Sequence, residues 1–424
     1  MLRPAIAAVI LPAAMPMPPR PPGTPTRFEP ALIVILAGVC AALHVGKLPP
    51  AIPVLREALG ISLVAAGFLL SAVQIAGMTT GLLVGRLADG LGLRRSMLLG
   101  LAVLALASAA GAMASGVAAL LVLRAVEGLG FLLVVLPAPS MVRRLVAPEH
   151  VTRVLGLWGG YMPLGTATAL LCGAPLLALI GWRPVWLSLA LLTLLAAIAL
   201  VTQVSGDSAT TTGARPLVAG RAPSPWTRVQ QTLVAPGPWL VALAFFLYSG
   251  QWLAVVGFLP TIYNQAGYSG VVVGVLTALA AGINMVGNIG AGRCLARGMR
   301  PGVLLSTAYL AMALGAVVAF GAQGHPVWQY LAVLVFSGVG GLIPGTLFSL
   351  AVVLAPGEAT VSTTVGWMQQ FSALGQFLGP PLVAWVATQT GGWHWTWVVT
   401  GSCSLLGIAL AAWLQRAWAD RALR

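Results

Sequence analysis

Four ionisable side chains lie inside long apolar stretches of the sequence, away from the ends of those stretches: His44, Lys47, Arg124 and Glu127. A charge at membrane depth costs about 2.5–3.5 kcal/mol on insertion scales, so such a group tends to face a cavity or a partner. Lysine and arginine can hold a carboxylate or a similar anion, while glutamate and histidine can take up and release protons. These residue types therefore suit the binding of a small anion coupled to proton movement.

The spacing of these residues predicts that they meet. His44 and Lys47 are three residues apart, as are Arg124 and Glu127, so each pair shares one face of a helix. If the first stretch runs outward, Lys47 lies about 10 Å and His44 about 15 Å below its outer end, at roughly 1.5 Å per residue. A fourth stretch running inward places Arg124 and Glu127 at the same depths. We predict one cluster of three basic groups and one acid.

Lys47 is the only lysine among the 22 Lys and Arg residues of the chain. At this position the chain therefore has a compact ammonium group on a flexible side chain, whereas its other basic residues carry the rigid, planar guanidinium of arginine. Two structural interpretations stay open. Arg124 and Glu127 could pair only with each other and with the backbone of the first helix, and His44 could be a hydrogen-bonded core histidine.

The elements that must position these residues are membrane-spanning helices. The chain is 59% hydrophobic and 7% charged, with a mean hydropathy of +0.96, which is more apolar surface than a water-soluble fold can cover. A span takes roughly 20 apolar residues, so about twelve fit, and we predict an all-α membrane protein. The expected helices are residues 31–54, 62–86, 95–115, 117–142, 151–180, 184–202, 239–263, 270–293, 302–321, 326–354, 360–388 and 394–415.

Composition divides the chain into two six-helix bundles, residues 29–202 and 239–415, joined by a polar cytoplasmic linker at 203–238. The Pro-rich residues 1–28 are expected to be a disordered tail, with a cleaved signal peptide or a misplaced start codon as alternatives. Residues 416–424 form a cytoplasmic tail.

Internal similarity supports this division. The turn G-W-R-P-V-W at 181–186 recurs as G-W-H-W-T-W at 392–397. A repeat of half the chain with a linker between the copies is typical of a two-bundle transporter.

The formal net charge of +14 would suit a nucleic-acid-binding protein, but the placement of the arginines argues against this function. Most of them fall on one side of the membrane if the helices alternate, which is the positive-inside pattern with both termini in the cytoplasm. We therefore expect a multi-pass protein of the inner membrane of a high-GC bacterium. The four cysteines, Cys40, Cys172, Cys294 and Cys403, have no paired spacing and predict neither disulfides nor a metal site.

Two motifs resemble those of the major facilitator superfamily. The stretch 85–95, G-R-L-A-D-G-L-G-L-R-R, is similar to the superfamily loop G-x-L-x-D-R-x-G-R-R between helices two and three, with Gly90 departing where a basic residue is usual. Residues 124–130, R-x-x-E-G-x-G, resemble R-x-x-Q-G-x-G on helix four. The first helix, A-L-H-V-G-K-L-P-P-A-I-P, looks like that of the cyanate and nitroimidazole transporter branch, which carries a basic residue before a proline.

The resemblance implies alternating access, with helices one and four lining a central cavity and the charged cluster in its N-terminal half. Lys47 and Arg124 would then bind substrate, and Glu127 and His44 would couple protons. Polar and aromatic residues of the second half would contact the uncharged part of the substrate: Tyr248, Gln251, Trp252, Asn284, Trp367 and Gln370. The expected gating residues are Asp89, Arg94, Arg95, Arg143 and Arg144, with Asp89 latching the cytoplasmic side.

The sequence thus predicts a secondary transporter, a symporter of a small anion and protons, that acts as a monomer in the bilayer without cofactor, metal or nucleic acid. An exporter of apolar drugs with the same fold is the alternative, since a cavity rich in Trp, Tyr and Met would suffice for it. A transporter-like sensor is a third reading. An enzyme is not expected, because the sequence has no Ser–His pairing, metal-ligand spacing or nucleotide loop.

Overall fold

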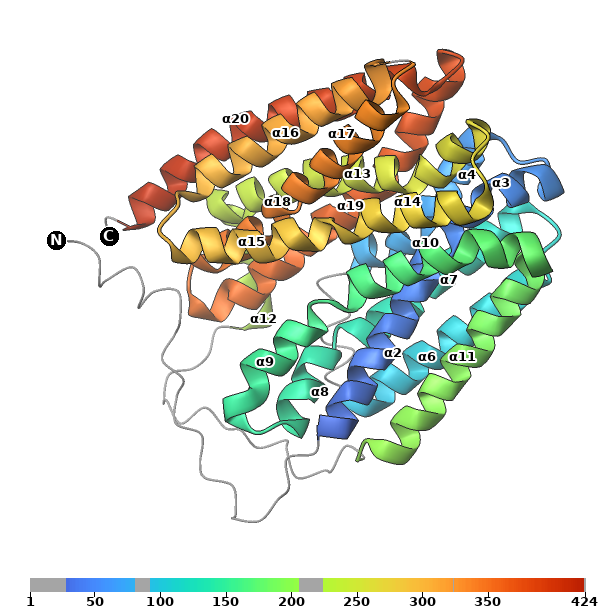
Figure 1. The fold of residues 1–424 in the computed structure, drawn as a ribbon. Helices are drawn as coiled ribbons and strands as arrows, with labels where there is room; N and C mark the ends of the chain where they lie inside the picture. The colour runs from blue at the N-terminus through green and yellow to red at the C-terminus, as the bar shows by residue number, and fades with distance from the viewer. Residues whose placement is uncertain (1–27, 81–91, 206–223, 323, 423–424) are drawn as a thin grey trace.

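The computed structural model describes residues 28–80, 92–205, 224–322 and 324–422, and the regular elements within them are helices (Figure 1). The all-α prediction is confirmed. Among the described residues, eleven helices are long and apolar enough to cross a membrane. The helix expected over 360–388 is present as α19 (Val361–Gln389), but its glutamines, hydroxyl side chains and two prolines leave it too polar to be counted with the eleven.

Residues 28–203 are called here the N-terminal half. Its helices are α2 (Phe28–Gly46), α3 (Leu48–Leu59), α4 (Leu63–Ser71), the 3-10 turn η1 (Ala72–Gln74), α6 (Leu93–Ala112), α7 (Val117–Val135), α8 (Ala138–Leu145), α9 (Pro148–Trp158), α10 (Tyr161–Ile180) and α11 (Trp182–Gln203). The single helix expected over 151–180 is interrupted between α9 and α10 at Gly159 and Gly160. Adjacent glycines weaken a helix because they have the largest backbone freedom to lose.

Residues 225–422 are called the C-terminal half. Its elements are α12 (Pro225–Val234), α13 (Pro236–Gln265), α14 (Gly270–Gly282), α15 (Asn284–Ala296), α16 (Pro301–Gly321), α17 (Pro326–Gly340), α18 (Leu342–Val353), η3 (Glu358–Thr360), α19, η4 (Trp393–Trp395) and α20 (Thr396–Ala422). Helix α12 falls within the stretch expected as linker. The Ser224 side chain caps it by accepting a hydrogen bond from the backbone N–H of Thr227, 3.1 Å away.

The two halves repeat one packing pattern. In the N-terminal half, α6 packs against α7 and α11, and α2 packs against α11. In the C-terminal half, α16 packs against α17 and α20, and α13 packs against α20. Single contacts repeat too: Cys40 Sγ lies 3.4 Å from Thr193 Oγ1, and Gln251 Oε1 accepts from Ser404 Oγ at 3.0 Å, each pair 153 residues apart. Between the halves, α4 packs against α19 and α10 against α14.

Four apolar clusters hold the described helices together, and the smallest of them, Leu170 with Val256 and Ala281, joins α10 to α13 and α14. One is built from residues of the N-terminal half and one from residues of the C-terminal half. The third, called here the shared cluster, combines Leu48, Ile52 and Leu70 of the first half with Phe258 and Val383 of the second. It lies at the distal end, where α3 ends and α4 begins. Toward the terminal end, where α2 begins and α20 ends, the two halves diverge (Figure 1).

Glycines let helices of the two halves approach closely. A Cβ on Gly67 of α4 would lie 2.9 Å from backbone atoms of Pro381 on α19, and one on Gly274 of α14 would lie 2.7 Å from the carbonyl oxygen of Leu171 on α10. Both distances are shorter than a side chain tolerates. These two sites therefore join the halves through backbone packing, which small residues permit in membrane helices.

Candidate functional site

Lys47 lies at the turn between α2 and α3. Leu48 begins α3, and Pro49 and Pro50 lie in its first turn, where prolines fit because the N–H groups there have no partner within the helix in any case. Gly46 lets α2 approach α10, since a Cβ there would lie 3.0 Å from the backbone of Thr166. Because one side of the turn is occupied by α10, the Lys47 side chain extends toward α6, α7 and α11.

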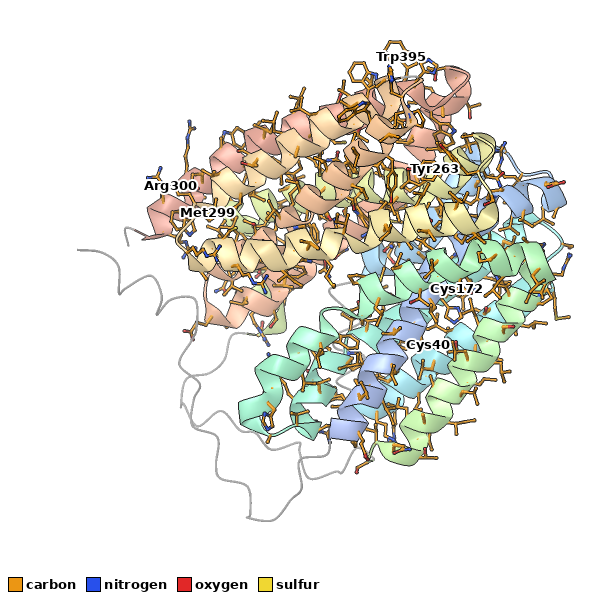
Figure 2. All side chains as sticks on the ribbon, viewed as in Figure 1. Cys40, Cys172, Tyr263, Met299, Arg300 and Trp395 are labelled. Carbon is orange, nitrogen blue, oxygen red and sulfur yellow. The ribbon has the colours of Figure 1, made fainter. Side chains whose placement is uncertain are left out.

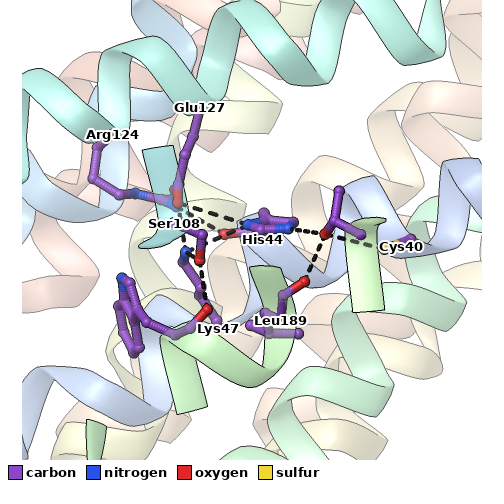
Figure 3. Close-up of polar contacts among 9 residues, drawn as sticks. Cys40, His44, Lys47, Ser108, Arg124, Glu127 and Leu189 are labelled. Carbon is purple, nitrogen blue, oxygen red and sulfur yellow. Dashed lines mark hydrogen bonds and ion pairs between the residues drawn. The ribbon is translucent and has the colours of Figure 1, made fainter. Parts of the chain in front are cut away.

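A buried carboxylate is shared by two cations (Figure 3). Lys47 Nζ lies 2.5 Å from Glu127 Oε1, and Arg124 Nη1 lies 2.5 Å from Glu127 Oε2. The exposed fractions are 3% for Lys47, 2% for Arg124 and 1% for Glu127. Arg124 Nη1 also donates to the carbonyl oxygen of His44 at 2.8 Å, which satisfies a carbonyl in the last turn of α2. We call His44, Lys47, Arg124 and Glu127 the charged cluster.

Lys47 has two further contacts that lie on other helices. Its Nζ donates to Ser108 Oγ of α6 at 3.0 Å and lies 4.7 Å from the ring centroid of Trp186 on α11. Ser108 Oγ in turn donates to the carbonyl oxygen of Trp186 at 2.9 Å. An aromatic face stabilises a desolvated ammonium. The ammonium is therefore held by a carboxylate, a hydroxyl and a ring from three helices.

The hydrogen bonds of His44 indicate its protonation state. Thr193 Oγ1 donates to the carbonyl oxygen of Leu189 at 2.7 Å, so this hydroxyl accepts from His44 Nε2, which is also 2.7 Å away. His44 Nδ1 then faces the Lys47 ammonium at 3.4 Å and can accept from it. This arrangement fits a neutral imidazole with its proton on Nε2. A second proton on Nδ1 would point toward Glu127 Oε1, which is 3.6 Å away.

The charged cluster carries more positive than negative charge. With His44 neutral, two cations share one carboxylate. Arg124 Nε and Nη2 are buried and have no hydrogen-bond partner among the described residues. Leaving a buried donor unpaired costs about 1–3 kcal/mol, and more when the group is charged. The cluster therefore has both the charge and the free donors to hold an additional anion.

Two glycines of the 124–130 motif set the position of α7. A Cβ on Gly128 would lie 2.1 Å from the carbonyl oxygen of Val73 in η1, and one on Gly130 would lie 2.9 Å from that of Gly100 on α6. The motif therefore lets α7 pack against both neighbours. Glu127, immediately before Gly128, is held at the level of Lys47 by this packing.

Among the predicted contacts of the second half, Tyr248, Trp252 and Asn284 come together. Asn284 Nδ2 donates to Tyr248 Oη at 2.9 Å and to the carbonyl oxygen of Ser337 at 2.8 Å, while Trp252 Nε1 donates to Ser337 Oγ at 3.0 Å. Ser337 was not predicted. The repeat could have identified it, because S-G-V-G at 337–340 occupies the place of E-G-L-G at 127–130.

The other three predicted contacts of the second half lie elsewhere. Gln251 is buried against Ser404 of α20, which places its side chain inside the C-terminal half. Gln370 Nε2 donates to the carbonyl oxygen of Met78 at 2.7 Å, across the two halves. Trp367 packs on Trp239, with ring centroids 5.0 Å apart.

The charged cluster points into the N-terminal half. Its partners outside the cluster, Ser108, Trp186 and Thr193, lie on α6 and α11 of the same half, and none of the contacts described above for the cluster reaches the C-terminal half. The expected roles of these residues in substrate binding and proton coupling stay predictions.

The comparison with known proteins identifies the family. Residues 34–374 match the family model described as "Major Facilitator Superfamily". The chain belongs to the major facilitator superfamily. Its multi-pass membrane character follows from this membership and from the apolar helices.

Solved structures of superfamily transporters share the fold. A bacterial homolog of the human lysosomal transporter Spinster, in an inward-facing and unoccupied conformation, superimposes with a TM-score of 0.73 at 16% identity, covering 94% of this chain and 99% of that one. A D-xylose-proton symporter superimposes with a TM-score of 0.72 at 17% identity, covering 91% and 97%. At such identities the likeness concerns the fold alone.

A curated relative matches part of the chain. The tetracenomycin C resistance and export protein of Streptomyces glaucescens is 28% identical over 158 residues, which is 37% of this chain and 29% of that protein. The chain therefore aligns with less than a third of the relative's length.

The predicted gating residues of this superfamily member are only partly described. Asp89 lies outside the described residues. Arg94 Nη2 donates to the carbonyl oxygen of Val201 on α11, within its own half. Arg95 is exposed at the start of α6, and Arg143 and Arg144 are exposed on α8.

Proposed function

We propose that this major facilitator protein is a secondary active transporter of a small anionic solute, coupled to protons. The observation that carries the proposal is the sharing of one buried carboxylate, Glu127, by Lys47 and Arg124, with Arg124 donors left over. Two buried cations share one acid, so an anion can replace the charge of Glu127 when this acid is protonated.

Proton coupling follows from charge balance within the charged cluster. When Glu127 takes up a proton, Lys47 and Arg124 lose their counter-charge, and a carboxylate or similar anion can replace it. When the anion leaves, Glu127 releases its proton and pairs with both cations again. The site keeps the same net charge in both states, so anion and proton move together. An unpaired buried ion costs several kcal/mol, which disfavours either species moving alone.

Access would alternate between the two ends of the molecule. The closed shared cluster at the distal end and the diverging halves at the terminal end suit a conformation open at the terminal end. We infer from the arginine placement that this end is cytoplasmic and that the protein lies in a bacterial inner membrane. Rocking of residues 29–202 against 239–415 would then open the distal end.

A thermal-shift screen of the purified full chain tests the proposal. The probes are formate, acetate, benzoate and nitrate, each at two pH values. At least one should raise the melting temperature of the wild type and fail to do so in Lys47→Ala. Arg56→Ala serves as control, because Arg56 is a partly buried cation of α3 outside the charged cluster. Stabilisation by none of these anions, or equal stabilisation of Lys47→Ala, would refute the anion site.

A second candidate function is export of apolar compounds, and the similarity to the resistance and export protein favours it. Ethidium efflux from proteoliposomes separates the two functions. An anion transporter carries the labelled anion found in the screen, loses this transport in Lys47→Ala and moves no ethidium. An exporter of apolar compounds moves ethidium in the wild type, and the anion does not change this efflux.

A further inference from the structure

The C-terminal half contains a cavity of about 270 Å³ at the distal end. Its walls come from α13, α14, α16, α17 and η4, and they include Tyr263, Tyr268, Phe320, Tyr330 and Trp393. Figure 2 shows Tyr263 among the helices of this half. The described residues that line the cavity include none of those in the charged cluster.

The walls of the cavity are aromatic and set at steep angles to one another. The rings of Tyr263 and Tyr268 have centroids 6.1 Å apart and planes at 85°, and those of Tyr263 and Tyr330 have centroids 6.4 Å apart and planes at 64°. Such rings offer both a face and an edge to an entering ring, which are the two arrangements that aromatic pairs prefer.

One buried polar atom of the described lining is left without a partner. Tyr263 Oη is buried and has no hydrogen bond among the described residues, whereas Tyr330 Oη donates to the carbonyl oxygen of Leu276 at 3.1 Å. Trp393 Nε1 is likewise satisfied, by Gln265 Oε1 at 2.8 Å. The described lining carries no Asp, Glu, Lys or Arg side chain, and its polar side chains besides the tyrosines and Trp393 are Gln329 and His394. A hydroxyl or carbonyl oxygen on a ligand would satisfy Tyr263, and the lining offers no carboxylate, ammonium or guanidinium to pair with an ionised ligand.

We propose that this cavity binds an uncharged, planar aromatic molecule with a hydroxyl or carbonyl oxygen that hydrogen-bonds to Tyr263 Oη. The site is independent of the anion proposed for the charged cluster.

Occupancy would also favour the closed distal end. The ring of Trp393 lies 5.0 Å from that of Phe258, centroid to centroid, and Phe258 belongs to the shared cluster that joins the halves. A ligand that holds Trp393 in place would therefore also hold Phe258 in the shared cluster.

Equilibrium dialysis of the purified full chain with 1-naphthol tests the site. Tyr263→Phe removes only the hydroxyl and should weaken 1-naphthol binding about three- to tenfold, the value of one hydrogen bond. The same change should leave the binding of naphthalene, which has no oxygen, unaltered. Ala319→Leu fills the cavity from α16 and should abolish binding of both probes. Tyr161→Phe, which removes a tyrosine hydroxyl in the N-terminal half, is the matched control and should bind like the wild type.

Two results would overturn the proposal. If Ala319→Leu and the wild type take up both probes equally, the probes only partition into the detergent. If Tyr263→Phe binds 1-naphthol as the wild type does, the hydroxyl is not the contact. Lys47→Ala should bind 1-naphthol normally, so a failure of the anion site and a failure of this site are distinguishable.

Discussion

At the scale of single residues, the chemistry centres on the carboxylate of Glu127, which is the only acid that the described contacts bring to Lys47 and Arg124. Each of its oxygens faces one cation at 2.5 Å. The neutral His44 beside it is fixed by the threonine hydroxyl of α11. In the proposed mechanism a proton would reside on Glu127 or on His44 Nδ1, and either choice would free a cation for an anion.

Glu127→Gln keeps the shape of the side chain and removes its charge. We expect the free energy of unfolding to fall by about 3–5 kcal/mol, because two buried cations lose their counter-charge. Formate should restore part of this loss and raise the melting temperature of the variant more than that of the wild type. Glu57→Gln, at an exposed position of α3, should show neither effect. A variant that formate stabilises no more than the wild type would argue that no anion reaches the two cations.

At the scale of helices, backbone contacts set the level and the rotation of the elements that carry the charged cluster. Gly128 lets α7 pack closely against η1, Gly130 lets α7 pack against α6, and Gly46 lets α2 pack against α10. Each contact depends on the absence of a side chain. The site is thus assembled by close approach of four helices that carry few polar groups.

Gly128→Ala is expected to disturb this assembly. Its Cβ would lie 2.1 Å from the carbonyl oxygen of Val73, so α7 must move away from η1, at a cost of about 1–3 kcal/mol for an overpacked contact. Gly292→Ala on α15, where no atom lies within 4 Å of the added Cβ, is the matched control and should be nearly neutral. Melting temperatures of the two purified variants give the comparison. Equal melting temperatures would show that α7 has room to shift.

The sequence predicts the depth of the charged residues along their helices, but it does not predict the direction in which their side chains point. The rise of a helix placed Lys47 at the depth of Arg124 and His44 at the depth of Glu127, and these four side chains do lie together. Ser108 and Thr193 could not be chosen in advance, because single hydroxyls are common in apolar helices and carry no signal of depth or facing. The direction into the N-terminal half depends on helix rotation, which packing at Gly46 and Gly128 determines.

At the scale of the whole molecule, the halves are joined by apolar and backbone contacts at the distal end and by a few polar contacts midway. Gln74 Nε2 donates to Gln376 Oε1 at 3.0 Å, and Gln370 Nε2 donates to the carbonyl oxygen of Met78. Both contacts link the η1 region to α19. In the proposed mechanism, opening of the distal end would have to break the shared cluster.

Phe258→Ala should favour that opening. Phe258 is fully buried in the shared cluster, and truncation of a buried phenylalanine costs about 3–5 kcal/mol in the conformation that buries it. The reporter is Leu55→Cys at the distal end, in a background in which the four native cysteines are replaced. A water-soluble maleimide should label this cysteine at least about tenfold faster when Phe258→Ala is also present than when it is absent. Phe336→Ala, buried within the C-terminal half alone, is the control. Equal labelling with both truncations would mean that the shared cluster is not the closure.

The polarity of α19 bears on how the chain enters the bilayer during synthesis. This helix of 29 residues carries two prolines and falls outside the group of spans that are apolar enough by themselves. It packs along α13 and α4, both of which are made earlier. We therefore expect α19 to integrate poorly when it emerges alone and efficiently when α13 already occupies the membrane, which glycosylation mapping of truncated chains would measure. Equal integration in both settings would contradict this dependence. The order of synthesis would then not compensate for the low hydrophobicity of α19.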